Sequence, residues 1–193
     1  MAPLPYAFRA WLFLRALDDI VAAYRAAARA HVSRPEEIET EVRRRVGIGP
    51  EDQFPDRDDD DAEDPIGRLY DEAGELEEQA GRGAHLVRKA FLIALFHHWE
   101  RHCNAELKWN KYSHPREWLS ERGKSAYAKE ILELERAANC AKHGPGHSCE
   151  NLYKMSCSLF PTVSTAAKAS ELNLVIEEPT LERFFTVVRN AAS

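Results

Sequence analysis

The stretch LVRKAFLIALFHHWERHCNAELKW, residues 86–109, decides the fold. Its first half, as far as Phe96, is apolar on nearly every side of a helix, which indicates a helix buried at the centre of a bundle. The pattern then becomes amphipathic and continues through Trp99 to about Trp109. The longest apolar run, residues 90–96, is much shorter than the roughly 18 residues that a membrane-spanning helix needs. The sequence therefore predicts no membrane span.

Helical patterns flank this segment on both sides. The first 46 residues predict two helices, because Ser33 and Pro35 are typical of a helix restart. Asp64 and Pro65 predict the start of the next helix, with Asp64 as its cap. Further helices are predicted at residues 116–142, 148–160 and 179–192.

These patterns predict an all-α bundle of about five long helices. Two other segments complete the chain: an acidic stretch that we expect to be disordered or a long surface loop, and a short extended piece at residues 172–176. We interpret the whole chain as one domain. Its predicted parts are N-terminal helices at 1–46, the acidic loop at 48–64, a core at 65–160, and a C-terminal segment with a final helix at 161–193.

Composition is that of a globular protein, with 193 residues, 44% hydrophobic and 30% charged. The net charge of −6 is local, because residues 51–64 alone carry −8 and the rest carries +2. A polyanionic partner is compatible with that balance, whereas duplex DNA binders are far more basic. The N-terminal stretch lacks the basic start of a secretory signal. We therefore expect a cytoplasmic protein whose four cysteines are reduced thiols.

The segment RAANCAKHGPG, residues 136–146, is the main candidate for chemistry. Arg136, Asn139 and His143 share roughly one face of a helix that ends in a glycine turn, and Lys142 is next to His143. Imidazole exchanges protons near neutral pH, and guanidinium and ammonium groups bind phosphate. This set suits phosphodiester cleavage without a metal. The alternative is structural, because basic residues also favour the last turn of a helix through its macrodipole.

The longer segment ELERAANCAKHGPG, residues 133–146, resembles the Arg-x(4–6)-His segment of HEPN domains (higher eukaryotes and prokaryotes nucleotide-binding). It is similar in particular to a prokaryotic subgroup in which a helix ends in AN-x-x-KHG-x-G. The following HSCENL (147–152) and the earlier FHHWER (96–101) also look like the matching parts of that subgroup. The resemblance spans roughly residues 66–160.

The resemblance implies an all-α homodimer in which two Arg/His motifs form one cleft. Active members cut RNA without metal or cofactor, by attack of the 2′-hydroxyl on the adjacent phosphate. Such domains occur as toxins with protein antitoxins and in phage defence. Carried over, Arg136 would hold or polarise the scissile phosphate, His143 would transfer a proton or bind the phosphate, and Asn139 would orient the imidazole or the phosphate. Beside them, we expect Lys142 to bind RNA phosphate. The implied partners are a second copy, an RNA substrate, and an antitoxin or other protein.

Two features depart from the pattern of active members. Ala137 stands where they often have a polar residue, and the Arg136–His143 interval of six residues is at the upper end of the range. The alternative is a non-catalytic helical module of the same fold that binds a protein partner or a nucleotide.

Two further patterns have functional and structural interpretations. Two groups of residues could be zinc ligands, but neither contains a Cys-x-x-Cys pair, so we predict no metal site. We favour small buried cysteines and core-edge histidines whose hydrogen bonds are satisfied. Aromatic and basic residues interleave over residues 99–127, which suits single-stranded RNA, but core aromatics explain the pattern better. The zinc groups are Cys140, His143, His147 and Cys149, and His98 with His102.

Overall fold

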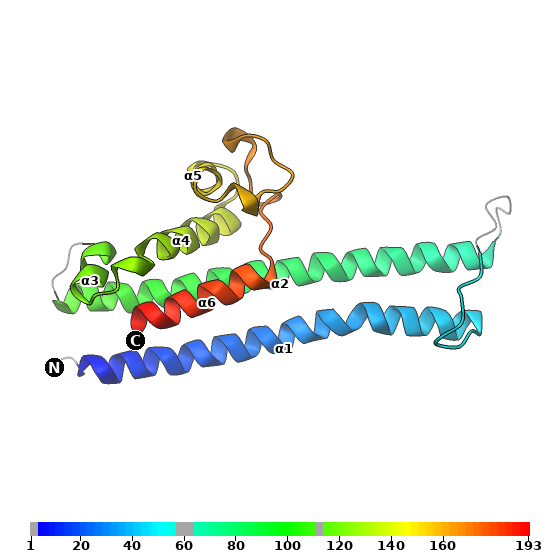
Figure 1. Cartoon of the computed structure of the whole chain (residues 1–193), viewed down its shortest axis with the longest axis horizontal. Helices are drawn as coiled ribbons and strands as arrows, with labels where there is room; N and C mark the ends of the chain where they lie inside the picture. Colours follow the sequence, from blue (N-terminus) through cyan, green and yellow to red (C-terminus); the bar gives the residue numbers. More distant parts are fainter. Residues whose placement is uncertain (1–3, 57–63, 111–113) are drawn as a thin grey trace. The chain divides into compact units, whose positions relative to one another are not determined.

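The computed structural model describes residues 4–56, 64–110 and 114–193. Within these ranges all regular elements are helical, which confirms the predicted all-α class. Contacts divide the chain into two compact units, unit 1 with residues 1–24 and 88–193, and unit 2 with residues 25–87. The α-helices of the described ranges, labelled in Figure 1, are α1 (Tyr6–Val46), α2 (Pro65–Asn110), α3 (Pro115–Glu121), α4 (Ala128–His143), α5 (His147–Met155) and α6 (Glu178–Ala192).

The predicted break between two N-terminal helices is wrong, because α1 runs without interruption through Pro35. A proline inside a helix removes one backbone hydrogen bond and costs about 3 kcal/mol. Ion pairs one turn apart, Glu39–Arg43 at 2.9 Å and Glu41–Arg45 at 2.9 Å, stabilise the helix beyond the proline. Ser33 and Pro35 therefore favour a helix start only locally, and the contacts of the longer helix α1 outweigh that preference.

The single helix predicted at residues 116–142 is also wrong. It is divided into α3, a 3-10 turn at Ser125–Tyr127, and α4. The division occurs at Gly123, whose φ of 68° lies in the left-handed region that ends a helix. Its N–H donates to the carbonyl of Ser120 at 2.9 Å.

The remaining boundaries agree with the sequence in part. Asp64 caps α2 as predicted, since its carboxylate accepts from the N–H groups of Ile66 and Gly67, each at 2.9 Å. The extended piece at 172–176 is not a strand in the described chain, and the N–H of Val175 donates to the carbonyl of Leu159 at 2.8 Å. Most of the expected acidic loop, residues 57–63, lies outside the described residues.

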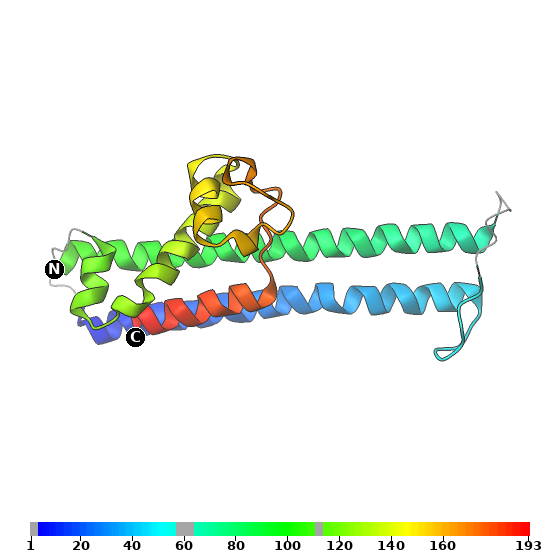
Figure 2. The same ribbon diagram turned by 45° about the horizontal axis from the view of Figure 1, so that its top comes forward.

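The core of unit 1 forms where α2, α6 and the start of α1 pack together. Leu92, Leu95 and Trp99 of α2 are buried, as the sequence predicts for its central helix. Figures 1 and 2 show α6 beside the N-terminal part of α1. There the ring of Tyr24 lies 5.7 Å from that of Phe185. Apolar burial of this kind is the main stabilising contribution to unit 1.

One ion pair is buried inside this core. Arg9 of α1 makes two parallel bonds to Glu106 of α2, Nε to Oε1 and Nη2 to Oε2, each 2.7 Å long. The Glu106 side chain is completely inaccessible to solvent. The hydrogen bond from Arg9 to Glu106 raises the pKa of Arg9, and this effect is larger than the lowering of that pKa by burial. The bidentate geometry satisfies both carboxylate oxygens and joins α1 to α2 at a fixed register.

His102 lies near this pair, stacked 4.4 Å from the ring of Phe13. Burial lowers its pKa to about 4, against the opposing effect of Glu106. His98, one turn earlier on the same face of α2, also stacks on Phe13, with ring centroids 4.2 Å apart, and its Nε2 is 3.0 Å from the carbonyl oxygen of that residue. Both histidines are therefore part of the core edge, as the structural interpretation expected. The hydrogen bonds expected for them are present at His98 but not at Nε2 of His102, which is buried without a partner in the described structure.

Unit 2 is a helical hairpin with little core of its own. Among its described residues, the buried apolar side chains are Val42 and Ala80. A cavity of about 250 Å³ lies between its helices, with Ile38, Leu69 and Leu76 in its wall. Such a hairpin buries too little apolar surface to be very stable.

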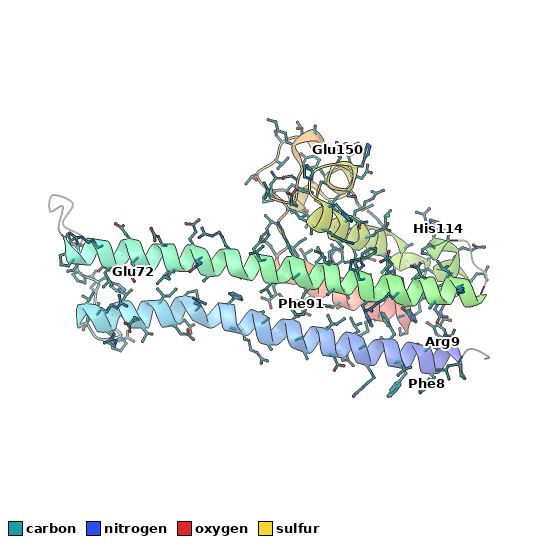
Figure 3. The ribbon with its side chains drawn as sticks, turned by 180° about the vertical axis from the view of Figure 1, so that it is seen from behind. Phe8, Arg9, Glu72, Phe91, His114 and Glu150 are labelled. Atoms are coloured by element: carbon teal, nitrogen blue, oxygen red, sulfur yellow. A yellow bond between two sulfur atoms is a disulfide. The ribbon has the colours of Figure 1, made fainter. Side chains whose placement is uncertain are left out.

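α1 also carries a strip of exposed apolar side chains in unit 1. Phe8, Trp11 and Leu12 of α1 are each about half exposed, as is Leu4 just before the helix, and the rings of Phe8 and Trp11 stack with centroids 5.7 Å apart. Figure 3 shows Phe8 pointing away from the helices that α1 packs against. Clustered exposed apolar residues are typical of surfaces that bind another molecule.

Replacing Glu106 with Gln tests the buried pair. We expect the free energy of unfolding to fall by about 3 kcal/mol, because the guanidinium of Arg9 stays buried without its counter-charge. The matched control is Asp18→Asn, which removes the carboxylate of the exposed pair with Arg189 and costs at most about 0.5 kcal/mol. Denaturant titration of both variants measures the difference, and equal stabilities would contradict the assignment.

Candidate functional site

α4 presents one face to the core and another to solvent. Ile131, Leu134 and Ala138 are buried, and α4 contacts α5 and α6. Glu133, on the edge of the buried face, accepts from Nη1 of Arg183 at 2.9 Å and from Oγ of Ser156 at 2.8 Å. Burial raises the pKa of Glu133, but these hydrogen bonds outweigh it and the net pKa is lowered. The carboxylate is therefore a charged anchor that holds α4 in place.

The three predicted catalytic residues lie along one edge of α4. Arg136 and Asn139 are half-buried and His143 is exposed as the last residue of the helix. Their i, i+3, i+7 spacing on a real helix gives the shared stripe that the sequence predicts. Nη1 of Arg136 donates to the carbonyl of Asn151 in α5 at 3.4 Å, which leaves its other donors for a ligand.

Lys142 lies at the border of that stripe and reaches α2. Its Nζ is 3.5 Å from Nε2 of His97, and Nδ1 of the same ring is 3.0 Å from Oε2 of Glu100. The side chains of His97 and Glu100 are 37% and 44% exposed, so the group is open to solvent. From the sequence, Glu100 on the central helix was a candidate to face the helix of residues 116–142 and to pair there with Arg136 or Lys142, most simply as a structural ion pair. In the structure Glu100 instead pairs with His97, and Lys142 contacts the His97 ring.

A glycine turn joins α4 to α5 directly after His143. Gly144 has φ 79° and ψ −159°, a conformation that side chains disfavour. Its N–H donates to the carbonyl of Cys140 at 3.3 Å, which ends α4. A Cβ at this position would lie 3.4 Å from Oε2 of Glu171, an oxygen that is buried without a hydrogen-bond partner in the described structure. The turn after the histidine therefore requires glycine.

A disulfide between Cys140 and Cys149 links the last turn of α4 to α5. The expectation of four reduced thiols is wrong for this pair, while Cys103 is a buried thiol and Cys157 an exposed one. The helical ends bring the two Cα atoms within 4.8 Å, a proximity that sequence spacing did not reveal. Cysteine usage therefore no longer supports a cytoplasmic location, which stays a prediction.

The disulfide also bears on the zinc interpretation. Cys140 and Cys149 bond to each other, so in this state neither supplies a thiolate. Within the described ranges, no three His, Cys, Asp or Glu side chains converge as metal ligands. Nor does any helix there have both the length and the apolar character to cross a membrane.

The aromatic residues of 99–127 divide between core and surface. Trp99 and Trp118 are buried, with ring centroids 5.7 Å apart. The guanidinium of Arg122 lies over the ring of Tyr6 at 3.5 Å. These contacts confirm the core interpretation for the two tryptophans, and the side chain of Trp109 and all of Tyr112 lie outside the described residues.

The disulfide can be tested by stability. Replacing Cys140 and Cys149 together with Ala should lower the free energy of unfolding by about 2.5 kcal/mol, because the nine-residue separation closes a short loop in the unfolded chain. Cys157→Ala is the matched control, because this exposed thiol forms no disulfide. Thermal melts with and without a dithiol reductant measure the effect. The wild type should lose the same stability in reductant, and the double variant should lose none.

The turn can be tested by a pair of glycine substitutions. Gly144→Ala should destabilise the protein by about 1–3 kcal/mol, since it forces a side chain into a strained conformation against Glu171. Gly74→Ala in α2, where a Cβ meets nothing within 4 Å, should instead stabilise by about 0.5–1 kcal/mol through helix propensity. Denaturant titration distinguishes the two signs, and a neutral Gly144→Ala would contradict the turn argument.

Comparison with known proteins adds no relative to this geometry. No family model, curated protein or solved structure matches the chain. The likeness to HEPN domains therefore remains a resemblance carried by the residues themselves.

Proposed function

We propose that this protein is a HEPN-like, metal-independent endoribonuclease that works as a homodimer. The observation that carries the proposal is the stripe of Arg136, Asn139 and His143 on α4, with Lys142 at its border. The side chains of the stripe are half-exposed or exposed, while α4 beneath them is anchored through Glu133 and through the disulfide of Cys140. Pre-organised cationic and proton-exchanging groups are what phosphodiester cleavage requires in the absence of a metal.

The charge distribution supports an RNA substrate for unit 1. This unit carries 17 Lys and Arg against 14 Asp and Glu, a net charge of +3. Unit 2 carries 9 basic and 18 acidic residues, a net charge of −9. The candidate site thus belongs to unit 1, whose net positive charge favours the binding of a polyanion. An antitoxin or another regulatory protein is the second partner we propose, in a toxin or phage-defence setting.

In the proposed reaction, Arg136 and Lys142 bind the scissile phosphate. The 2′-oxygen attacks phosphorus, the bond from phosphorus to the 5′-oxygen breaks, and a 2′,3′-cyclic phosphate forms. His143 transfers a proton in this step, and Asn139 orients the phosphate or the imidazole. The exposed strip on α1 that includes Phe8 offers apolar surface for a second copy.

The alternative function is a non-catalytic module that binds a protein or a nucleotide. The observation in its favour is the hydrogen bond from Arg136 to the carbonyl of Asn151, which gives the arginine a structural role. Ala137 supports it as well, because this position is polar in many active HEPN proteins and is buried here.

RNA cleavage in EDTA tests the proposal. Purified wild type should cut a mixed RNA substrate and leave cyclic-phosphate ends, and His143→Ala and Arg136→Ala should each lose about 10²–10⁴-fold in rate. His147→Ala, which removes an exposed imidazole from the first turn of α5, should retain wild-type activity. The assay is run without reductant so that the disulfide stays intact.

Light scattering on the same samples gives the mass of the particle. A dimer that cleaves RNA supports the proposal in full. A folded wild type that does not cleave RNA would contradict the ribonuclease proposal and favour the binding module. An active monomer would contradict the proposal that two copies form one shared cleft.

A further inference from the structure

Cleavage by attack of a 2′-hydroxyl needs two proton transfers. One group removes the proton from the 2′-hydroxyl, and another gives a proton to the leaving 5′-oxygen. The resemblance supplies only His143 for both tasks within one copy. His143 is exposed, and no hydrogen bond to its ring is recorded in the described structure, so the protein does not fix its tautomer.

The imidazole ring of His97 on α2 is oriented by a hydrogen bond, whereas in the described chain that of His143 is not. Its Nδ1 lies 3.0 Å from Oε2 of Glu100, so the ring donates to the carboxylate and carries its remaining lone pair on Nε2. A carboxylate that holds the far nitrogen of an imidazole fixes the tautomer and stabilises the imidazolium that forms on proton uptake. Nε2 faces Nζ of Lys142 at 3.5 Å, at the C-terminal end of α4.

We infer that His97 is the general base of the cleavage step, that Glu100 is its positioning residue, and that His143 is the general acid. This inference rests on the proposed ribonuclease function. It assigns a second catalytic histidine to the same copy of the chain, so the two proton transfers do not both depend on His143.

The geometry also gives Lys142 a double task. In the free protein its ammonium group occupies the lone pair of His97 Nε2. A phosphate diester is a stronger partner for an ammonium group than a neutral imidazole, because the phosphate carries a full negative charge. Substrate binding therefore draws Lys142 to the phosphate and leaves Nε2 free for the 2′-hydroxyl.

Protons and bonds balance in this scheme. His97 Nε2 takes the proton of the 2′-hydroxyl, the 2′-oxygen bonds to phosphorus, and the phosphorus bond to the 5′-oxygen breaks. The imidazolium of His143 gives its proton to the departing 5′-oxygen. The enzyme ends with His97 protonated and His143 neutral, and hydrolysis of the cyclic phosphate or exchange with solvent restores both.

A structural surface pair is the competing interpretation of His97 and Glu100. Exposed ion pairs contribute little to stability, so on that interpretation Glu100→Gln changes neither folding nor cleavage. Under the inference, the same variant keeps its fold but cuts RNA about 10–10²-fold more slowly, and His97→Ala loses about 10²–10⁴-fold. Glu135→Gln, which alters an exposed carboxylate on α4, is the matched control and keeps full activity.

A modified RNA separates the base from the acid. A substrate with sulfur in place of the bridging 5′-oxygen has a leaving group that needs no proton. His143→Ala should recover most of its lost rate on this substrate, and His97→Ala should recover none. Nitrogen-15 NMR of the imidazoles gives a second readout. The His97 ring should carry its proton on Nδ1 in the wild type and lose that preference in Glu100→Ala, which has no acceptor at this position.

The outcomes distinguish the two proposals. An inactive wild type overturns the ribonuclease function and the inference with it. An active wild type whose His97→Ala variant cuts RNA at the normal rate overturns the inference alone. Recovery of His97→Ala on the sulfur substrate, in place of His143→Ala, overturns the assignment of base and acid.

Discussion

The buried pair of Arg9 and Glu106 fixes the register between α1 and α2, and the placement of the other groups on α2 depends on that register. A carboxylate without any solvent access persists only because a guanidinium satisfies both of its oxygens. The pair requires one register between α1 and α2, since a shift of one residue separates the charges. With that register fixed, α2 directs Leu95 and Trp99 into the core and leaves His97 and Glu100 at the surface.

The candidate site depends on this rotation of α2 and on the anchoring of α4. Glu133 binds Arg183 of α6 and Ser156 after α5, so α4 is attached to the elements on both of its sides. The disulfide and the Gly144 turn then fix its last turn against α5. Catalytic geometry tolerates small errors only, and a helix end normally frays. These constraints explain how groups at a helix terminus hold their positions.

Features that depend on spacing within one helix could be predicted from the sequence, whereas contacts between residues far apart in the sequence could not. The helical class, the cap at Asp64 and the stripe that contains Arg136 follow from spacing along one helix. The contact between Lys142 and His97 joins residues 45 apart, and no pattern within a single helix encodes it. The predictions of helix boundaries were wrong where two local preferences competed. At Pro35 the helix α1 continues where a break was predicted, and at Gly123 the helix ends where one continuous helix was predicted.

The disulfide and the proposed chemistry bear on each other. Cys140 belongs to the same helical turn as Asn139, and Cys149 lies two residues before the Asn151 carbonyl that holds Arg136. Breaking the S–S bond removes one of the links between α5 and the end of α4, while the Glu100–His97 pair on α2 is unaffected because both residues belong to one helix. Reduction should therefore disturb the proposed phosphate contact of Arg136 more than the proposed base, His97. The two parts of the candidate site are thus held in different ways. The Glu100–His97 pair is formed within one helix, whereas the position of Arg136 relative to α5 is supported by the disulfide.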